Sequence, residues 1–355
     1  MKRLCFVFLL FVLAISACAQ NATPLSVGTK TPTATIKSTS TFTHTPTPTK
    51  TLTLTPTATP TLDFLSLGFP STPIPYWETL SSKFLSYDED HYYVYEKEMH
   101  GRPVRVVIHK DSGITEDFRD EIADWIFYAW ATSWEVFDGF PYESYTFKIP
   151  IDQTYRGAHG IGYEFEVKDM LPIKGDWPKY QKREWRIDFA HEVFHAWNPN
   201  SLPPEDFSRA WFIEGCTEYY SYRITDSFDK NYGYYYGMNR MWSEYKTIGR
   251  SNDVPLANAN KNELEGRLRV TIIYMKGGLV CYMIDKQLVN HGLSLDVLMQ
   301  TLYTDFVTNG TKFTSESLQS TLESITNDDW SEFFNLYVFG TEPLPLNGTF
   351  EFLKH

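Results

Sequence analysis

Hydrophobic and polar positions divide the chain into a part that favours strands and a later part that favours helices. Residues 91–109 alternate between apolar and polar side chains, as in Val104-Arg105-Val106, which predicts strand structure. A similar alternation predicts a strand over residues 145–151, and the glycine-containing segment 157–167 predicts another. Helical spacing dominates after residue 183. We therefore expect an α+β fold with a strand-rich first half and a helical second half.

A helix is expected between the first two of these strand segments. It should begin near Thr115 and end at Gly139-Phe140-Pro141, because glycine and proline interrupt helices. Its apolar residues recur at intervals of three, four and seven positions, which places them on one face: Phe118, Ile122, Trp125, Ala129 and Val136.

The first residues of the chain resemble an export signal. A basic Met-Lys-Arg start precedes an apolar run over residues 4–15, which is too short to span a bilayer of about 30 Å. Ile15-Ser16-Ala17-Cys18 resembles the lipobox of bacterial lipoproteins. The resemblance implies that residues 1–17 are a lipoprotein signal peptide and that the Cys18 thiol is acylated. The alternative is an ordinary signal peptide with an incidental cysteine.

Residues 18–62 predict a disordered stalk behind this lipidated cysteine. They consist mostly of Thr, Pro, Ser and Ala, with repeats such as Thr45-Pro46-Thr47-Pro48, and they cannot bury enough apolar surface to fold. The remaining residues, 63–355, predict one globular domain. We expect this domain to lie outside the cytoplasm of a bacterium, attached by its lipid anchor to the cell membrane or the outer membrane.

Composition narrows the functional classes. The chain has 355 residues, of which 42% are hydrophobic and 21% are charged, so it is not disordered overall. Its formal net charge of −12 argues against nucleic acid as a partner, because such binding needs clustered Lys and Arg. Only four cysteines are present, which excludes a disulfide-based scaffold.

The candidate chemistry centres on His191-Glu192-Val193-Phe194-His195. Two histidines four positions apart lie on one face of a helix, so both imidazoles can reach one Zn²⁺ ion. Glu192 can contact a water molecule at that ion and act as general base. An apolar stripe should dock the helix (Ile187, Ala190, Phe194 and Trp197), and a polar stripe should line a cleft (Glu184, Asp188, His191, His195 and Asn198).

A third ligand is expected from a second helix. Glu214 follows His195 with eighteen residues between them, and the spacing His-Glu-x-x-His, eighteen residues, Glu is the signature of the thermolysin-like zinc peptidases, or gluzincins. Glu218 lies one helical turn beyond Glu214. It can accept the outer N–H of His191, or it can be a solvated surface carboxylate.

Four segments resemble the glycyl aminopeptidase family of gluzincins over roughly residues 115–345. The matching segments are Phe140–Phe147, His191-Glu192-Val193-Phe194-His195-Ala196-Trp197-Asn198, Tyr274-Met275-Lys276-Gly277-Gly278 and Phe333–Thr341. The resemblance implies a thermolysin-like catalytic domain with the His-Glu-x-x-His helix at the junction of its two halves, and one Zn²⁺ per chain.

The resemblance also implies roles for two further residues. Tyr274 stands where the family keeps a tyrosine beside the tetrahedral intermediate, whose oxyanion a phenol can stabilise. Glu164, in Gly160-Ile161-Gly162-Tyr163-Glu164-Phe165, stands where the family binds the free α-amine of its substrate, but Tyr163 and Phe165 depart from the family's pattern. That departure weakens the expectation of exopeptidase action more than that of hydrolysis. Cys216 and Cys281 can pair, or they can be two buried thiols.

These features predict a surface-anchored zinc peptidase that cleaves peptide substrates. By family analogy, it would be an aminopeptidase that prefers small N-terminal residues. The first alternative within the enzyme class is a zinc endopeptidase. The alternative from another class is a catalytically silent peptidase-like binding module, which would have lost a metal ligand or the base. The sequence retains His191, Glu192, His195 and Glu214.

Overall fold

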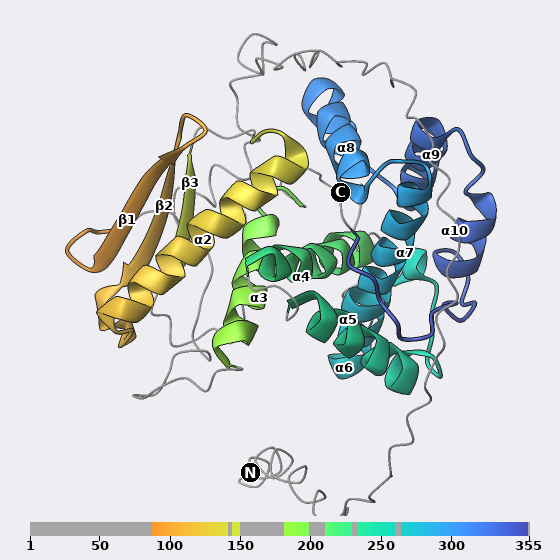
Figure 1. The fold of residues 1–355 in the computed structure, drawn as a ribbon, viewed down its shortest axis with the longest axis horizontal. Coiled ribbons are helices and arrows are strands. Elements are labelled where there is room, and N and C mark those ends of the chain that lie inside the picture. The colour runs from red at the N-terminus through yellow and green to blue at the C-terminus, as the bar shows by residue number, and fades with distance from the viewer. Residues whose placement is uncertain are drawn as a thin grey trace, which may run out of the picture. The chain divides into compact units, whose positions relative to one another are not determined.

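A computed structural model describes residues 87–140, 144–149, 181–198, 210–228, 233–259 and 264–353 (Figure 1). The chain divides into two units, Met1–Thr61 and Leu62–His355, and all described residues belong to the second. Cys18, the predicted signal peptide and stalk, Glu164 and the predicted strand over 157–167 lie outside the described residues. Within them, no helix is both long enough and apolar enough to cross a membrane.

The strand segment predicted over 91–109 is a hairpin. Strands β1 (Tyr92–Met99) and β2 (Arg102–His109) are antiparallel, with Tyr92 opposite His109 and Met99 opposite Arg102. The two-residue turn at His100 and Gly101 has φ values of 50° and 71°, a left-handed geometry that suits a tight hairpin and that glycine adopts without strain. Strand β3 (Tyr145–Ile149) pairs in parallel with β2, so the order is β1-β2-β3.

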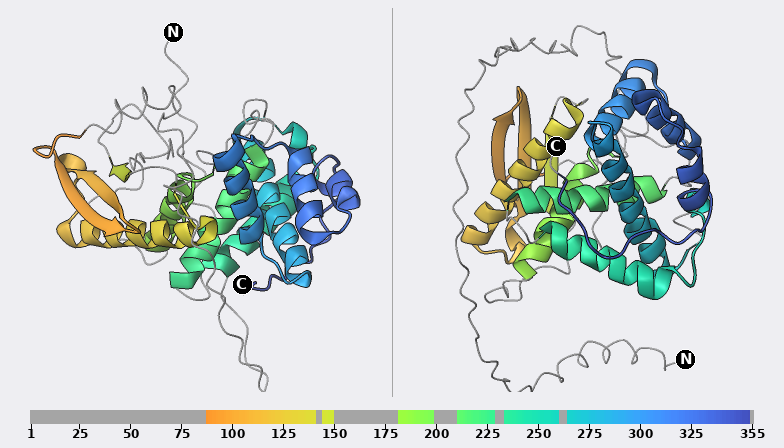
Figure 2. Two further views of the ribbon diagram at one scale, coloured as in Figure 1. Left: turned by 90° about the horizontal axis from the view of Figure 1, so that it is seen from above. Right: turned by 45° about the vertical axis from the view of Figure 1, so that its right-hand side comes forward.

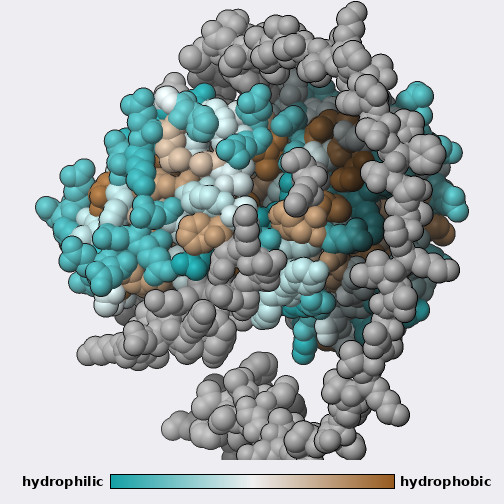
Figure 3. Space-filling model, viewed as in Figure 1, coloured by the Kyte–Doolittle hydropathy of each residue, from teal (hydrophilic) through white to brown (hydrophobic). Residues whose placement is uncertain are grey.

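Helix α2 (Glu116–Phe137) confirms the predicted helix and packs against β1 and β2. It begins after Thr115 and ends at Asp138, whose left-handed backbone lets its N–H donate to the Trp134 carbonyl. The predicted inner face is buried except for Phe118, which is partly buried. The Trp125 indole donates to the Arg186 carbonyl at 2.9 Å and so joins α2 to the next helix. The surface over β1 and the start of α2 is mainly hydrophilic (Figure 3).

The second half of the described chain is helical, as predicted, and the whole has mixed helical and sheet content. In Figures 1 and 2 the sheet lies at one end and helices α7 to α10 lie at the other. The α-helices are α3 (Gln181–Phe194), α4 (Thr217–Phe228), α5 (Gly233–Glu244), α6 (Gly266–Arg269), α7 (Gly277–Asn290), α8 (Leu295–Asn309), α9 (Ser315–Thr326) and α10 (Ser331–Tyr337). Short helices are η1 (Lys110–Ser112), η3 (Trp211–Cys216), η4 (Tyr245–Gly249), η5 (Leu256–Asn258) and η6 (Val270–Lys276).

Two π-helical segments, η3 and η6, pack closely where the helical layers meet. Each runs directly into an α-helix, η3 into α4 and η6 into α7. A Cβ atom on Gly215 would lie 2.5 Å from the Gly277 carbonyl carbon, so only glycine allows this approach. Gly277 is the first residue of α7, and a disulfide between Cys216 and Cys281 also joins η3 to α7, with the two Cα atoms 5.5 Å apart. The two cysteines are therefore paired rather than free buried thiols.

Candidate metal centre

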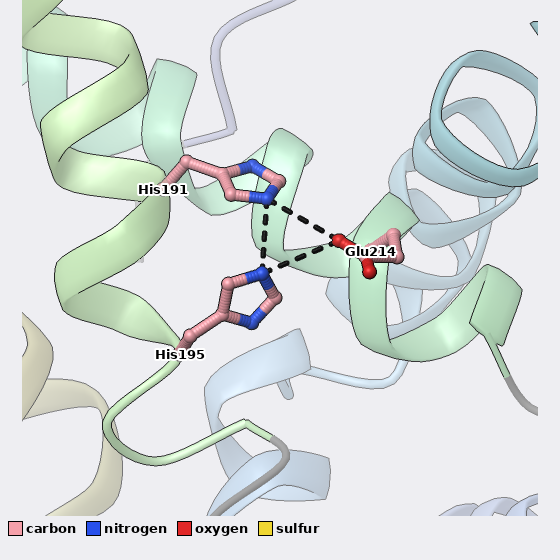
Figure 4. Close-up of side chains that lie close together, drawn as sticks. All are labelled: His191, His195 and Glu214. Carbon is pink, nitrogen blue, oxygen red and sulfur yellow. Dashed lines mark hydrogen bonds and ion pairs between the residues drawn. The ribbon is translucent and has the colours of Figure 1, made fainter. Parts of the chain in front are cut away.

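Helix α3 presents the two histidines in one turn at its C-terminal end. The His195 N–H donates to the His191 carbonyl at 3.2 Å, so the helical ladder reaches His195 although the regular helix ends at Phe194. The predicted apolar stripe is buried against the core and fixes the helix's rotation. The imidazole Nε2 atoms of His191 and His195 lie 3.0 Å apart and face the same space (Figure 4).

Glu214 completes a three-residue group from the opposite side. It lies in η3, so the predicted second helix is π-helical where it carries Glu214 and becomes α-helical only from Thr217. Its Oε2 atom is 3.5 Å from the His191 Nε2 and 3.3 Å from the His195 Nε2 (Figure 4). π-Helical turns of this kind widen the helix and often lie at functional sites.

This group fits one metal ion. One ligand atom from each of His191, His195 and Glu214 lies within 4.8 Å of the others, and the three residues are 7%, 6% and 6% exposed. Two imidazoles and a carboxylate are a known set for zinc, and three protein ligands leave a fourth position open. Two lone-pair nitrogens and a carboxylate oxygen that converge in a buried position suit a shared positive partner, such as a divalent cation.

The outer nitrogens of both histidines are held, but by different groups. The His191 Nδ1 is 3.0 Å from the Glu218 Oε2, while the His195 Nδ1 is 2.5 Å from the backbone oxygen of Asn198. Each acceptor calls for N–H at Nδ1 and leaves the Nε2 lone pair for a metal. The structure thus places Glu218 beside His191, in a buried position rather than on the surface.

Charge around His191 explains the ionisation of this pair. Burial alone would lower the pKa of His191, but hydrogen bonds with Glu214 and Glu218 and the nearby carboxylate charges raise it to about 10. Burial alone would raise the pKa of Glu218, but its bond to His191 and the positive charges of His191 and Arg240 lower it. In the metal-free chain this negative field favours a second proton on His191, and the same field would favour a cation that takes the place of that proton at Nε2.

Glu192 lies beside the group with an unused oxygen. It follows His191 on α3, and its Oε2 atom is buried without a hydrogen-bond partner among the described residues. A buried carboxylate oxygen without a donor costs free energy unless another molecule satisfies it. A water molecule or a substrate amine is a suitable donor, which is what a general base requires.

Tyr274 reaches the group from η6. Its ring stacks on His191, with centroids 5.9 Å apart and planes inclined by 17°. Burial, the charge of Glu214 and a hydrogen bond with the Glu214 side chain all raise the pKa of Tyr274. The phenol therefore stays protonated and can donate a hydrogen bond.

Two members of this network were missed by sequence reasoning as functional positions. The Asn198 backbone oxygen holds His195, and the Tyr222 hydroxyl donates to the Glu218 Oε1 at 2.5 Å. Asn198 stood out only as a polar residue in the stripe with the histidines. Tyr222 lies four positions beyond Glu218, a helical neighbour that spacing alone could have suggested.

Comparison with known proteins points to one peptidase family. Residues 175–337 match the model of the Peptidase family M1 domain. This segment contains both histidines, Glu192, Glu214, Glu218 and Tyr274. No curated protein matches the chain.

Solved structures share the fold at low sequence identity. An aminopeptidase N family protein from Idiomarina loihiensis superposes with a TM-score of 0.60 and 18% identity, over 71% of this chain and 47% of that one. An M1 zinc metallopeptidase from Deinococcus radiodurans, solved with a bound Tyr-Ser-Ala substrate, gives 0.53 and 12%, over 72% and 52%. The chain thus has the fold of M1 peptidases and spans about half the length of these structures.

Proposed function

We propose that this chain is a zinc-dependent peptidase of the M1 type, and that it acts as an aminopeptidase. The observation that carries the proposal is the convergence of His191, His195 and Glu214, next to Glu192, whose buried Oε2 has no hydrogen-bond partner within the part of the chain that the structure describes. The match of residues 175–337 to the M1 peptidase domain supports it. A metal-ligand group alone would suit a structural site, but a structural site does not need a free base.

Zn²⁺ would be held by His191, His195 and Glu214, one ion per chain. When bound, zinc supplies a Lewis acid that polarises oxygen atoms in the site. The side chains perform the proton transfers. Glu192 takes a proton from the attacking water and delivers it to the departing amine nitrogen, as the carbon–nitrogen bond breaks. The Tyr274 hydroxyl donates to the former carbonyl oxygen as negative charge develops there.

We further propose a thermolysin-like arrangement, with the His-Glu-x-x-His helix between the strand-rich and helical parts. The packing of α3 against both α2 and α4 supports it. Glu164 would bind the substrate's free α-amine, and the first residue would be small. The finer assignment to the glycyl aminopeptidases rests on the motifs around His191, Tyr274 and Phe333.

The place of action would be outside the cytoplasm of a bacterium. A lipid on Cys18 and a stalk over residues 18–62 would hold the domain at the cell membrane or the outer membrane. The Cys216–Cys281 disulfide supports this location, because such bonds persist mainly in oxidising compartments. Peptides in the envelope or the surroundings would be the substrates, and nucleic acid would not be a partner.

The rival function is a silent peptidase-like module that binds peptides without cleaving them. Such a module has no need for a general base, yet the Glu192 carboxylate is retained, and its Oε2 has no partner among the residues that the structure describes. A zinc endopeptidase uses the same centre and differs only in having no anchor for the α-amine. These three functions predict different substrates, so one set of peptides separates them.

The test is hydrolysis of matched peptides by the purified chain. Peptides beginning with Gly, Ala, Leu or Arg would be offered with a free or an acetylated N-terminus, before and after metal removal by a chelator. We expect cleavage of free Gly- and Ala-peptides, its loss with the chelator and its return with added Zn²⁺. Cleavage of acetylated peptides at the same rate would establish an endopeptidase. Zinc binding without any cleavage would favour the silent module.

A further inference from the structure

We propose that Asn198 is a positioning residue that fixes the two sides of the metal centre relative to each other. It lies three positions after His195, it is 0% exposed, and it bonds to both sides. The inference rests on the metal role proposed above. It concerns how the ligands are held rather than the reaction itself.

The first contact is with the histidine side. The Asn198 backbone oxygen accepts from the His195 Nδ1 at 2.5 Å, which sets the ring's tautomer and direction. Past Phe194 the chain tightens, with Ala196 and Trp197 donating to carbonyls three positions back at 3.0 Å each. The tight turn brings the backbone of Asn198 under the imidazole, where a continued α-helix would carry it away.

The second contact is with the glutamate side. The Asn198 Nδ2 lies 3.2 Å from the Ile213 carbonyl, 3.5 Å from the Phe212 carbonyl and 3.3 Å from the Thr217 Oγ1. Ile213 directly precedes Glu214 in η3. The side-chain amide of Asn198 therefore hydrogen-bonds to the π-helical turn next to Glu214, and a shift of that turn would break these bonds.

The oxygen atom of the Asn198 side chain supports a role in positioning rather than in stability. The Asn198 Oδ1 is buried and has no hydrogen-bond partner among the described residues. An unpaired buried acceptor is unfavourable, and its cost offsets much of what the donor side contributes to stability. An amide with this balance adds little net stability, so its main consequence is the geometry that its N–H groups impose on η3.

The test compares zinc release from variants of the full chain. Asn198→Ala keeps the backbone oxygen that holds His195 and removes only the grip on η3. Asn198→Asp keeps the shape but replaces the donors with a carboxylate that faces two carbonyl oxygens. The matched control is Ser133→Ala, which removes a buried hydroxyl that donates to the Ala129 carbonyl at 2.8 Å in α2, outside the metal group.

Release of zinc to an excess of a coloured chelator would be followed at one pH, beside thermal unfolding of the metal-free chains. We expect release from Asn198→Ala to be about 10–100-fold faster than from the parent, and release from Asn198→Asp to be faster still. Ser133→Ala should unfold at a lower temperature yet release zinc at the parent rate. Asn198→Ser, which keeps a short donor, should fall between Ala and the parent and serves if Asn198→Ala does not fold.

Parent-like release from Asn198→Ala or Asn198→Ser would overturn the proposal, even if either variant is less stable. Equal acceleration in Ser133→Ala would also overturn it, because general loosening would then explain the effect. The readout needs no hydrolysis, so the proposed peptidase activity can fail while this proposal stands. A parent chain that takes up no zinc would instead defeat the metal assignment on which both rest.

Discussion

The last turn of α3 and the residue after it place two of the proposed metal ligands, whereas η3 places the third from a π-helical segment on the opposite side. The spacing of His191 and His195 follows from the helical ladder, so local structure is enough to aim both rings. The position of Glu214 does not follow from its own segment. It depends on residues that are far away in sequence.

Three kinds of long-range contact hold the η3 side. Gly215 meets Gly277 so closely that a side chain would collide with backbone. The Cys216–Cys281 disulfide joins η3 to α7. The Asn198 side chain donates hydrogen bonds to the backbone carbonyls just before Glu214. Local helical geometry therefore determines the positions of the two histidines, whereas tertiary packing determines the position of Glu214. Substitutions on the α3 side and on the η3 side should therefore differ in their effects on catalysis, zinc binding and stability.

The largest expected effect is on the α3 side, where chemistry and metal binding can be separated. Glu192→Gln removes the base while the three ligands stay in place. We expect kcat to fall by about 10²–10⁴-fold with zinc still bound at one ion per chain. Peptide hydrolysis and metal content on the same sample measure both. Unchanged turnover would show that another group accepts the proton.

Tyr274→Phe is the corresponding change in η6, which packs against η3. It removes the hydroxyl and leaves the ring that stacks on His191. Loss of one donor to a developing oxyanion should lower kcat by about 10²–10³-fold, with little change in KM. A rise in KM alone would mean that the phenol binds the substrate in its ground state.

Removing the disulfide tests how the η3 side is held. The bond closes a loop with a sequence separation of 65, so replacing both cysteines by alanine should lower the free energy of unfolding by roughly 2–4 kcal/mol. Denaturant unfolding measures this value. Reductant should destabilise the parent to a similar extent and leave the double variant unaffected. Equal stability of both chains under oxidising conditions would argue against the bond.

Glu218→Gln changes the partner of His191 without touching a ligand. The amide can still accept from the imidazole, but the negative charge that favours a cation is lost. We expect zinc affinity to fall by about 10–100-fold, measured by competition with a chelator. Tyr222→Phe, which removes one donor to Glu218, should cost less. A larger loss from Tyr222→Phe than from Glu218→Gln would contradict this order.

The sequence predicted the locally encoded features well. The hairpin segment, helix α2 and the histidine pair follow from periodicity and from a fixed spacing. Glu214 could be proposed as the third ligand only because its distance from His195 is a family signature. Tertiary contacts that no local pattern encodes determine three further features: the π-helical form of η3, the end of α3 at Phe194 and the hydrogen bonds from Asn198 to η3. Pairing of Cys216 with Cys281 was left open for the same reason.

The most direct test of the centre is the zinc content of a variant on the packed side. Glu214→Ala would be compared with the parent and with Glu218→Gln, which changes the neighbouring carboxylate outside the proposed ligand set, after equilibration with saturating Zn²⁺ and removal of unbound metal. We predict one bound zinc per chain in the parent and in Glu218→Gln at saturating metal, and no tightly held zinc in Glu214→Ala. Retention of one zinc with parental affinity by Glu214→Ala would contradict this prediction.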